Sequence, residues 1–310
     1  MKAIVIEQYG DVDQLIEKEF PEPVIKENQV LIEMHATSIN PIDWKIRAGY
    51  MKDYMPVEFP LILGWDAAGV VVEVGTKVTN FKVGDEVFAR PATENGTYAE
   101  YVAVDENLVA LKPTNISFEE AASVPLAGLT AWQCLVDFGS VKEGDTVLIH
   151  AGSGGVGSLG IQIAKSLGAH VLSTASGKNE AFLKSLGVDT FINYETTDFT
   201  DVAKDVDLVV DTMGGEILEK SLSVVKKGGK LVSIAGQPNQ EAARANGITA
   251  ESLWLKPNGK QLAELGALLE SGEVKTHIGH TFSLTEEGLR EAHALSATHH
   301  AKGKIVIKVK

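Results

Sequence analysis

The sequence predicts an α/β protein made of an antiparallel, barrel-like β unit and a parallel, doubly wound sheet. Three observations predict this fold class. Short strand-like segments separated by turn residues fill residues 1–115. Strand-like and helix-like segments alternate over residues 145–235, which is typical of a parallel sheet. A glycine-rich run at residues 151–157 joins a strand-like segment to a helix-like one.

The first unit is predicted to contain short strands at residues 3–6, 30–36, 69–74, 86–89, 98–104 and 109–111. Turns such as Val83-Gly84-Asp85 separate them. Ser117-Phe118-Glu119-Glu120 reads as a capping box that opens a helix, and a second helix is expected over 129–138. The alternating tail at 303–309 is expected to return to this unit as a strand.

The second unit is predicted to alternate strands and helices. Strands are expected at 146–150, 169–175, 189–193, 206–211 and 230–235. Helices are expected at 156–167 and at 216–225, where Lys226-Lys227-Gly228-Gly229 would end the second helix. A further helix at 259–270 should extend this unit.

The run Ala151-Gly152-Ser153-Gly154-Gly155-Val156-Gly157 reads as G-x-G-x-x-G with Gly152, Gly154 and Gly157 as its glycines. The first glycine allows a tight turn, the second lets the backbone approach a pyrophosphate, and the third lets the next helix pack closely on the strand. The helix start offers free N–H groups and a positive dipole end to phosphates. The run predicts a Rossmann-type dinucleotide site, and a plain glycine-rich turn is the alternative.

These patterns predict a catalytic unit of residues 1–120 and 283–310 and a Rossmann dinucleotide unit of residues 121–282. The dinucleotide unit would then be inserted into the first unit. We expect a cleft between the two.

Composition excludes several classes of function. A net charge of −14 argues against a nucleic-acid or anionic-membrane surface, which needs clustered Lys and Arg. No apolar run approaches the ~18 residues of a membrane span, and the N-terminal stretch becomes acidic too soon for a signal peptide. The only cysteine, Cys134, excludes an intramolecular disulfide and a cysteine-rich metal site. We therefore expect a cytoplasmic protein without nucleic-acid or membrane partners.

The end of the predicted second strand indicates which dinucleotide binds. It reads Ser173-Thr174-Ala175-Ser176-Gly177-Lys178-Asn179, without the acid that accepts hydrogen bonds from the adenosine ribose of NAD. Glu180 follows several residues late, in what reads as the first turn of a helix. Hydroxyls and the Lys178 ammonium suit a 2′-phosphate, so NADP is predicted. The alternative for Lys178 is a solvated loop lysine.

Four further motifs accompany the glycine loop, namely Ser38-Ile39-Asn40-Pro41-Ile42-Asp43-Trp44-Lys45, Gly64-Trp65-Asp66-Ala67-Ala68-Gly69, Gly96-Thr97-Tyr98-Ala99-Glu100-Tyr101 and Leu126-Ala127-Gly128-Leu129-Thr130-Ala131. In this order they resemble the medium-chain dehydrogenase/reductase superfamily, specifically its zinc-independent quinone oxidoreductase branch, which includes zeta-crystallin-like proteins. The resemblance covers nearly the whole chain. It implies that the first unit is a GroES-like antiparallel β-barrel.

The resemblance also shows where zinc ligands are missing. Zinc alcohol dehydrogenases of the superfamily carry Gly-His-Glu where this chain has Gly64-Trp65-Asp66, and an indole does not bind zinc. Their cysteine ligands would fall near residues 40–43 and near Leu126, where this chain has no thiol. The sequence therefore predicts no metal, with His299-His300 as a solvated helix end or a weak adventitious site.

Without zinc, the Lewis acid that polarises a simple carbonyl is absent. A conjugated substrate fits better, because hydride attack on an enone or quinone collects charge on an oxygen that hydrogen-bond donors stabilise. Preorganised donors of this kind contribute ~3 kcal/mol each.

Four residues are candidate catalytic groups, the first of them placed by the resemblance. Asn40 would lie beside the nicotinamide and orient a carbonyl or the cofactor, although an Asn before Pro41 can simply shape a turn. Asp43 would hold Lys45 or a neighbouring backbone group, or be purely structural. Lys45 and Tyr50 are candidate proton donors. Related proteins often have Tyr in place of Lys45, and the alternative for Tyr50 is a pocket wall.

Resemblance and strand position together give the cofactor residues. Thr130 resembles the threonine that meets the nicotinamide carboxamide, with a helix-start hydroxyl as the alternative, and Tyr194 resembles a tyrosine near the adenosine phosphate. Asp211 reads as a strand-end or turn residue. The predicted cofactor-binding residues are Thr130, Gly152, Ser153, Gly154, Gly155, Val156, Gly157, Thr174, Ser176, Lys178, Asn179, Tyr194, Ala235 and Gly236.

The sequence thus predicts an NADPH-dependent reductase of quinones or α,β-unsaturated carbonyls that acts by direct hydride transfer. One alternative is a reductase of simple aldehydes or ketones with the same cofactor. Another is an NADPH-binding sensor or crystallin-like protein with little turnover. The resemblance implies a homodimer joined through the dinucleotide units.

Overall fold

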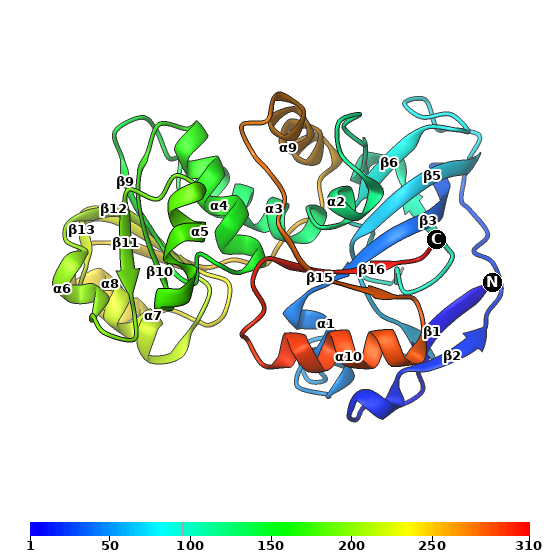
Figure 1. Cartoon of the computed structure of the whole chain (residues 1–310), viewed down its shortest axis with the longest axis horizontal. Coiled ribbons are helices and arrows are strands. Elements are labelled where there is room, and N and C mark those ends of the chain that lie inside the picture. The colour runs from blue at the N-terminus through cyan, green and yellow to red at the C-terminus, as the bar shows by residue number, and fades with distance from the viewer. Residues whose placement is uncertain (95) are drawn as a thin grey trace. The chain divides into compact units, whose positions relative to one another are not determined.

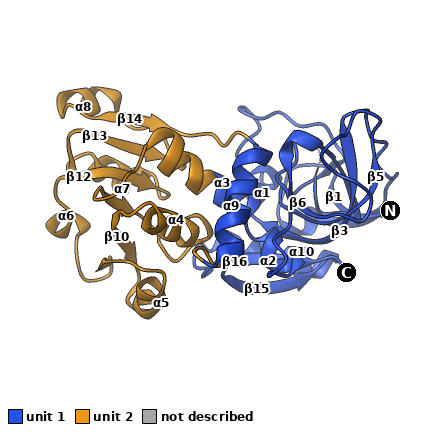
Figure 2. Ribbon diagram, turned by 90° about the horizontal axis from the view of Figure 1, so that it is seen from above, with its two compact units in different colours: residues 1–129, 257–272, 276–310 blue, residues 130–256, 273–275 orange. Residues whose placement is uncertain are grey.

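The structure, a computed structural model, describes residues 1–94 and 96–310. It divides into two compact units, coloured separately in Figure 2. Unit 1 comprises Met1–Leu129, Pro257–Gly272 and Thr276–Lys310, and unit 2 comprises Thr130–Lys256 and Glu273–Lys275. Residues 121–129, 257–272 and 276–282, which the sequence analysis gave to the dinucleotide unit, therefore lie in unit 1.

Unit 1 is built on two β-sheets. The larger has the strand order β15-β16-β3-β5-β6-β8, with β7 also paired to β3, and its pairs are antiparallel except β15 with β16. The smaller is antiparallel, in the order β2-β1-β4. The strands are β1 (Lys2–Ile6), β2 (Ile16–Glu19), β3 (Gln29–Ile39), β4 (Leu61–Ile62), β5 (Ala67–Val74), β6 (Glu86–Ala89), β7 (Tyr101–Asp105), β8 (Val109–Leu111), β15 (Ile278–Ser283) and β16 (Lys304–Lys308).

The helices of unit 1 begin at recognisable caps. Ser117 and Glu120 form both hydrogen bonds of the predicted capping box, at 3.1 and 2.8 Å, and Thr285 caps α10. Sequence analysis predicted the capping box but not α1 or α10. The helices are η1 (Val12–Gln14), α1 (Pro41–Arg47), η2 (Glu106–Leu108), α2 (Phe118–Ala122), α9 (Gly259–Ser271) and α10 (Glu286–Ala297), labelled in Figure 1 where space permits.

The C-terminal strand returns to unit 1, as the sequence predicted. β16 pairs antiparallel with β3, with Val306 opposite Ser38. Ile305 and Ile307 join Ile4 and Trp65 in one buried cluster. The two ends of the chain therefore share a core.

Helix α9 does not extend unit 2 as predicted, because it packs on β8 and η2 in unit 1. Its glycines explain the packing. A Cβ on Gly259 would lie 2.6 and 2.7 Å from the carbonyl oxygens of Asn107 and Val109, so only glycine allows this approach. An amphipathic pattern identifies a helix but not the surface that it covers.

Unit 2 contains a six-stranded, fully parallel sheet in the order β11-β10-β9-β12-β13-β14. Numbered along the chain, this is the 3-2-1-4-5-6 order of dinucleotide-binding sheets. Its strands are β9 (Thr146–Ile149), β10 (His170–Ala175), β11 (Thr190–Asn193), β12 (Val206–Asp211), β13 (Val225–Ser233) and β14 (Thr249–Ser252).

The helices of unit 2 connect these strands. They are α4 (Gly155–Ser166), η4 (Gly177–Asn179), α5 (Glu180–Ser185), α6 (Phe199–Val202), α7 (Gly215–Ser221) and α8 (Gln240–Ala245). α4 contacts β9 and β10, and α7 contacts β12 and β13. The predicted helix at 129–138 is observed as the end of α3 (Pro125–Trp132), which begins in unit 1, followed by a π-helical segment, η3 (Gln133–Phe138).

The predicted helix at 216–225 was too long. α7 ends at Ser221, and β13 already begins at Val225. Lys226, Lys227, Gly228 and Gly229 form an irregularity within β13, because Val206 and Leu208 of β12 pair with Val225 and Lys230. Gly228 has a φ of +81° there. Among the described residues, no helix has the length and apolar character of a membrane span.

Candidate active site

Asn40 lies at the start of α1, with its side chain held by two charged groups. Its amide nitrogen donates to Asp66 Oδ2 at 2.7 Å, and its amide oxygen accepts from Lys304 Nζ at 2.6 Å. All three side chains are buried. These bonds fix the orientation of the side-chain amide. Asn40 therefore does more than shape a turn before Pro41.

Asp66 is the centre of this network, which we call the Asp66 network: Ser38, Asn40, Asp66 and Lys304. Oδ2 also accepts from Ser38 Oγ and lies 3.3 Å from Lys304 Nζ, and Oδ1 accepts from the Leu126 amide at 2.6 Å. The Asp66 side chain is 0% exposed and that of Lys304 is 6% exposed. A carboxylate buried to this degree needs such a set of donors and a counter-ion.

Asp43, at the third position of α1, belongs to a second buried chain of hydrogen bonds. Its Oδ2 accepts from the Asn40 backbone amide at 2.8 Å and from the Tyr98 hydroxyl at 2.7 Å. His293 Nε2 lies 3.1 Å from the Tyr98 oxygen. Because the Tyr98 proton points to Asp43, Nε2–H of His293 is the donor to Tyr98.

Burial shifts the pKa values along this chain. It raises the pKa of Asp43 to about 7, opposed by the two hydrogen bonds to its carboxylate. It also lowers the pKa of His293 to about 3, with a smaller contribution from Arg47. Asp43 Oδ1 and His293 Nδ1 have no hydrogen-bond partner among the described residues. The bond from the Asn40 backbone amide makes Asp43 a capping residue of α1. Among the described residues, no hydrogen bond or ion pair joins Asp43 to Lys45.

Lys45 and Tyr50 both lie beside the Trp44 ring. Lys45 Nζ lies 5.8 Å from the Trp44 ring centroid, and the Tyr50 ring meets Trp44 edge to face at 6.0 Å. Tyr50 is 71% exposed. Of the four predicted catalytic residues, Asn40 and Asp43 are therefore buried in networks, Lys45 is half-buried and Tyr50 is open to solvent.

The glycine loop connects β9 to α4, as predicted. A Cβ on Gly152 would lie 2.1 Å from Ser173 Oγ, and one on Gly157 would lie 2.4 Å from the Ala151 carbonyl oxygen. A Cβ on Gly154 would meet only that carbonyl, at 3.4 Å. Gly152 and Gly157 are thus required by packing inside the protein, whereas Gly154 leaves its side open to a ligand.

His150 and Thr174 lie next to the start of the glycine loop and support it through hydrogen bonds. His150 is 1% exposed, and its Nε2 and Nδ1 lie 2.9 Å from Ser221 Oγ and 3.1 Å from Thr174 Oγ1. Ser221 donates to Ile217 O, so His150 donates to Ser221 through Nε2–H and accepts from Thr174 through Nδ1. Burial lowers the pKa of His150 to about 4, which keeps the ring neutral.

Thr174 was predicted to bind the cofactor, but the structure gives its hydroxyl an internal role. Its Oγ1 also accepts from the Ala151 amide at 3.1 Å. Ala151 has a φ of +52°, a conformation that is unfavourable for a residue with a Cβ. The hydroxyl of Thr174 therefore helps to hold the first residue of the loop in a strained conformation.

Most of the remaining predicted cofactor residues lie at the carboxyl ends of strands in unit 2, whereas Thr130 lies within α3. Ser176, after β10, is buried and accepts from Asn179 Nδ2 at 3.1 Å, while Lys178 is exposed. Tyr194, after β11, is 57% exposed. Thr130 is the first residue of unit 2 and is buried.

Two turns are joined at the ends of β12 and β13. Asp211 accepts from the amides of Met213 and Gly214 and from Ser233 Oγ. Ser233 Oγ in turn accepts from the amides of Ala235 and Gly236, each at 3.1 Å. Asp211 is thus a turn residue, as predicted, and it orders the predicted Ala235-Gly236 turn through Ser233.

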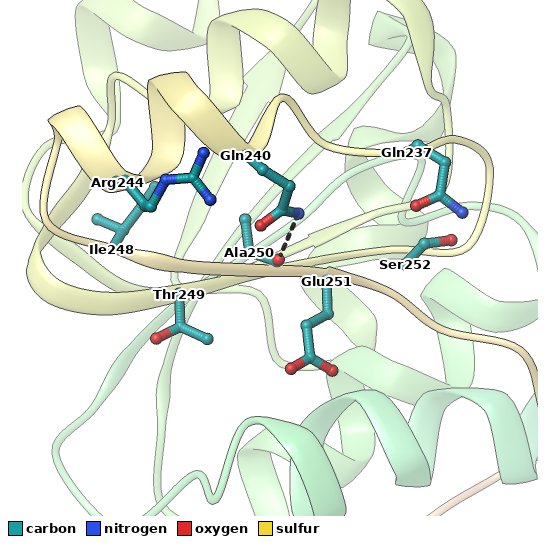
Figure 3. Close-up of a pocket in the computed structure, with 8 residues that line it drawn as sticks. All are labelled: Gln237, Gln240, Arg244, Ile248, Thr249, Ala250, Glu251 and Ser252. Atoms are coloured by element: carbon teal, nitrogen blue, oxygen red, sulfur yellow. Dashed lines mark hydrogen bonds between the residues drawn. The ribbon is translucent and has the colours of Figure 1, made fainter.

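An open depression lies along β14 and α8 (Figure 3). Gln240 crosses it to donate to the Ala250 carbonyl at 2.9 Å, and Arg244 and Glu251 are among the side chains that line it. None of the predicted site residues is in its lining. We assign it no role in the site.

Trp65, which the sequence analysis compared with the zinc-binding histidine of zinc alcohol dehydrogenases, is part of the core of unit 1. Its ring is buried, its Nε1 donates to the Thr93 carbonyl at 3.0 Å, and the Arg90 guanidinium lies 5.2 Å from the ring centroid. In the part of the chain that the structure describes, no group of three or more His, Cys, Asp or Glu side chains is placed to hold a metal ion. Burial raises the pKa of Cys134 to about 12.

Comparison with known proteins agrees with this architecture. A 2-methylene-furan-3-one reductase of Solanum lycopersicum is 40% identical over 317 residues, which cover 99% of this chain and 79% of that protein. A chloroplastic NADPH-dependent alkenal/one oxidoreductase of Arabidopsis thaliana is 38% identical over the same shares. The chain belongs to the quinone oxidoreductase branch of the medium-chain dehydrogenase/reductase superfamily.

Family models and a solved structure confirm the fold class. A model described as alcohol dehydrogenase GroES-like domain matches residues 26–114, and one described as zinc-binding dehydrogenase matches residues 186–307. The structure of the quinone oxidoreductase from Coxiella burnetii has a TM-score of 0.90 and 39% identity, covering 100% of this chain and 99% of that one. The chain is an oxidoreductase with a GroES-like and a Rossmann domain.

Sequence analysis missed the partners of its own candidate residues. Asp66 stood in a family motif without an assigned role, and Lys304 is 264 residues from Asn40 in the chain, so no local pattern connects them. Tyr98 and His293 are 195 residues apart. His150 differs from these residues, because its position directly before the glycine loop in the sequence could have indicated that it supports the loop.

Proposed function

We propose that this protein reduces quinones or α,β-unsaturated carbonyl compounds with NADPH and without a metal ion. Likeness over 99% of the chain to two proteins named as reductases of a methylene-furanone and of alkenals and alkenones carries the proposal. One of these names includes NADPH. The single cysteine and the buried Trp65 support a site without zinc.

The residues of unit 2 fit a dinucleotide. The open side of Gly154 and the amides in the first turn of α4, which Gly154 begins without a side-chain cap, would receive the pyrophosphate. Lys178 and Tyr194 would bind at the adenosine end, beside Ser176 and Asn179. Thr130 would meet the nicotinamide carboxamide. When bound, NADPH supplies the hydride.

Residues in and next to α1 would bind and orient the substrate. The fixed amide of Asn40 retains one N–H for a carbonyl oxygen, and a preorganised donor of this kind contributes ~3 kcal/mol as charge develops on that oxygen. Lys45 or Tyr50, or water, would supply the proton that completes the reduction. Asp43 would act through α1, whose first turn it caps.

We also propose that the protein is a cytoplasmic homodimer joined through its dinucleotide units. The free, buried Cys134 suits a reducing compartment, although the name of one relative places that protein in the chloroplast. Light scattering during size-exclusion chromatography tests the assembly. A mass of about twice the 33.2 kDa of one chain is expected, and a mass of one chain would contradict it.

The activity is tested by mixing the protein with NADPH and a panel of quinones, enones and saturated aldehydes while following nicotinamide absorbance. We expect oxidation of NADPH by quinones or enones that a chelator does not reduce. Activity on saturated aldehydes alone, or loss of activity with the chelator, would contradict the proposal. Binding of NADPH without turnover would favour a sensor or crystallin-like role.

Lys178→Ala tests the cofactor assignment separately. Removal of the ammonium is expected to weaken NADPH binding by about tenfold and to leave NADH binding nearly unchanged, since only NADPH carries the 2′-phosphate. Fluorescence titration of each cofactor measures both constants. An unchanged ratio of the two would remove Lys178 from the site.

A further inference from the structure

The ends of β10 and β11 bring two distant segments together in unit 2. The strands are parallel, with Ala175 opposite Asn193. The residues that follow them, Ser176 to Asn179 and Tyr194 to Glu195, therefore leave the same edge of the sheet. This edge is where sheets of this order recognise the adenosine ribose, at the end of the second strand.

Glu195 contacts the turn after β10 directly. Its carboxylate Oε2 accepts a hydrogen bond from the Gly177 amide at 2.9 Å, across 18 residues of chain. The Glu195 amide donates to Asn193 Oδ1 at 3.1 Å, which holds the backbone of Glu195 beside the turn. A Cβ on Gly177 would lie 2.9 Å from Asn193 Nδ2, so the two segments are in close contact.

This contact changes the charge at the predicted ribose site. The stretch Ser173 to Asn179 contains no acid, which favours NADP. The topology nevertheless supplies the carboxylate of Glu195, from the turn after the neighbouring strand β11. This carboxylate accepts from the amide of Gly177, the residue directly before Lys178 in the chain. A basic and an acidic residue, Lys178 and Glu195, thus lie on two turns that are joined by a hydrogen bond, and their charges act oppositely on a 2′-phosphate.

We infer that Glu195 is a specificity-determining residue that weakens the preference for NADPH and lets the protein use NADH as well. This inference rests on the proposed dinucleotide function. A 2′-phosphate carries about two negative charges and is repelled by the carboxylate, whereas the 2′-hydroxyl of NADH can donate to it. Because Glu195 is exposed, salt screens the repulsion.

Glu195→Gln tests the inference, because glutamine keeps an oxygen that can accept from the Gly177 amide and removes only the charge. The dissociation constants of NADPH and NADH are measured by fluorescence titration at low salt and at 0.5 M salt. We expect NADPH to bind about three- to tenfold more tightly at low salt, with less gain at high salt. NADH is expected to bind unchanged or more weakly.

Glu180→Gln is the matched control. Glu180 is an exposed carboxylate at the start of α5, close in sequence to the same turn, but it is paired with Lys184 at 2.6 Å. We expect this variant to keep both constants within about twofold of the wild type, since salt bridges at exposed sites contribute little.

Three results would overturn the inference alone: no change in the NADPH constant of Glu195→Gln, an equal gain for NADH, or an equal gain in Glu180→Gln. A wild type that binds neither cofactor would overturn the proposed function and the inference with it. If the wild type binds both cofactors, the dinucleotide function stands, and the Glu195→Gln result alone decides the inference about Glu195.

Discussion

At the residue scale, the Asp66 network is the feature that most constrains the site. Asn40 is the predicted substrate-orienting residue, and its amide cannot rotate without breaking bonds to both Asp66 and Lys304. The ion pair is buried, so it contributes orientation more than net stability. Removing one of its charges leaves the other buried without a counter-ion, which makes the role of the ion pair measurable.

Asp66→Asn is expected to lower the free energy of unfolding by about 3 kcal/mol, because the buried Lys304 ammonium loses its counter-ion. Urea denaturation measures this change. Adding Lys304→Met to that variant should cost less than the two single changes together. Lys308→Met is the control on the same strand, since Lys308 is 55% exposed, and should change stability by less than ~0.5 kcal/mol. Equal costs at positions 304 and 308 would contradict this account.

His150 gives the protein a pH dependence of known sign. Its pKa falls from 6.5 to about 4 on burial, so its contribution to stability is complete above pH 6.5 and is lost as the pH falls towards 4. The cost of His150→Gln should therefore shrink by about 2 kcal/mol between pH 7 and pH 5, as measured by urea denaturation. A cost that is independent of pH would show that His150 is not buried in its neutral form.

Other buried groups contribute to the pH dependence of the free energy of unfolding. They do not contribute to the difference between His150→Gln and the wild type. His293 has the same sign as His150, because burial lowers its pKa to about 3. Asp43 has the opposite sign: its pKa rises from 3.8 to about 7, so its contribution is present below 3.8 and is lost as the pH rises to 7. Comparison of variant with wild type at each pH isolates His150.

At the element scale, different glycines of the loop serve packing and cofactor binding. Gly157→Ala places a Cβ 2.4 Å from the Ala151 carbonyl and should cost about 2 kcal/mol or more of stability. Gly154→Ala makes one contact at 3.4 Å, so stability should change by less than ~1 kcal/mol while NADPH binds at least about tenfold more weakly. Thermal unfolding and fluorescence titration measure the two effects.

Gly160→Ala is the control for that pair. Gly160 lies within α4, and a Cβ there has only ordinary contacts, the nearest at 3.6 Å. The variant should be up to ~1 kcal/mol more stable and should bind NADPH normally, because alanine favours a helix. If Gly154→Ala bound NADPH as tightly as Gly160→Ala, the assignment of the loop to the pyrophosphate would be wrong.

The element predictions succeeded where local pattern determines the structure and failed where tertiary contacts do. Strands at 86–89, 109–111 and 206–211 match β6, β8 and β12 because buried strands are short apolar runs. Lys226-Lys227-Gly228-Gly229 read as a helix end but is an irregularity inside β13. Nothing in the local sequence showed that pairing with β12 would continue the strand through it.

At the scale of the whole molecule, the chain is organised by contacts between its ends. Lys304 follows the last loop and reaches Asn40, and α9 packs on β8 through glycines that a helical pattern does not distinguish. The sequence could indicate Asn40 and the glycine loop, since each lies in a local motif. It could not indicate Asp66 with Lys304, or Glu195 with Gly177, because those pairs depend on topology.

The central claim is direct transfer of hydride from NADPH to a conjugated acceptor, and isotope labelling tests it most directly. The protein is supplied with NADPH that carries two deuterium atoms at nicotinamide C4, together with an enone that it reduces, and the product is analysed by NMR. The account predicts one deuterium at the β-carbon and a solvent proton at the α-carbon. Deuterium on the carbinol carbon, or a product without deuterium, would contradict it.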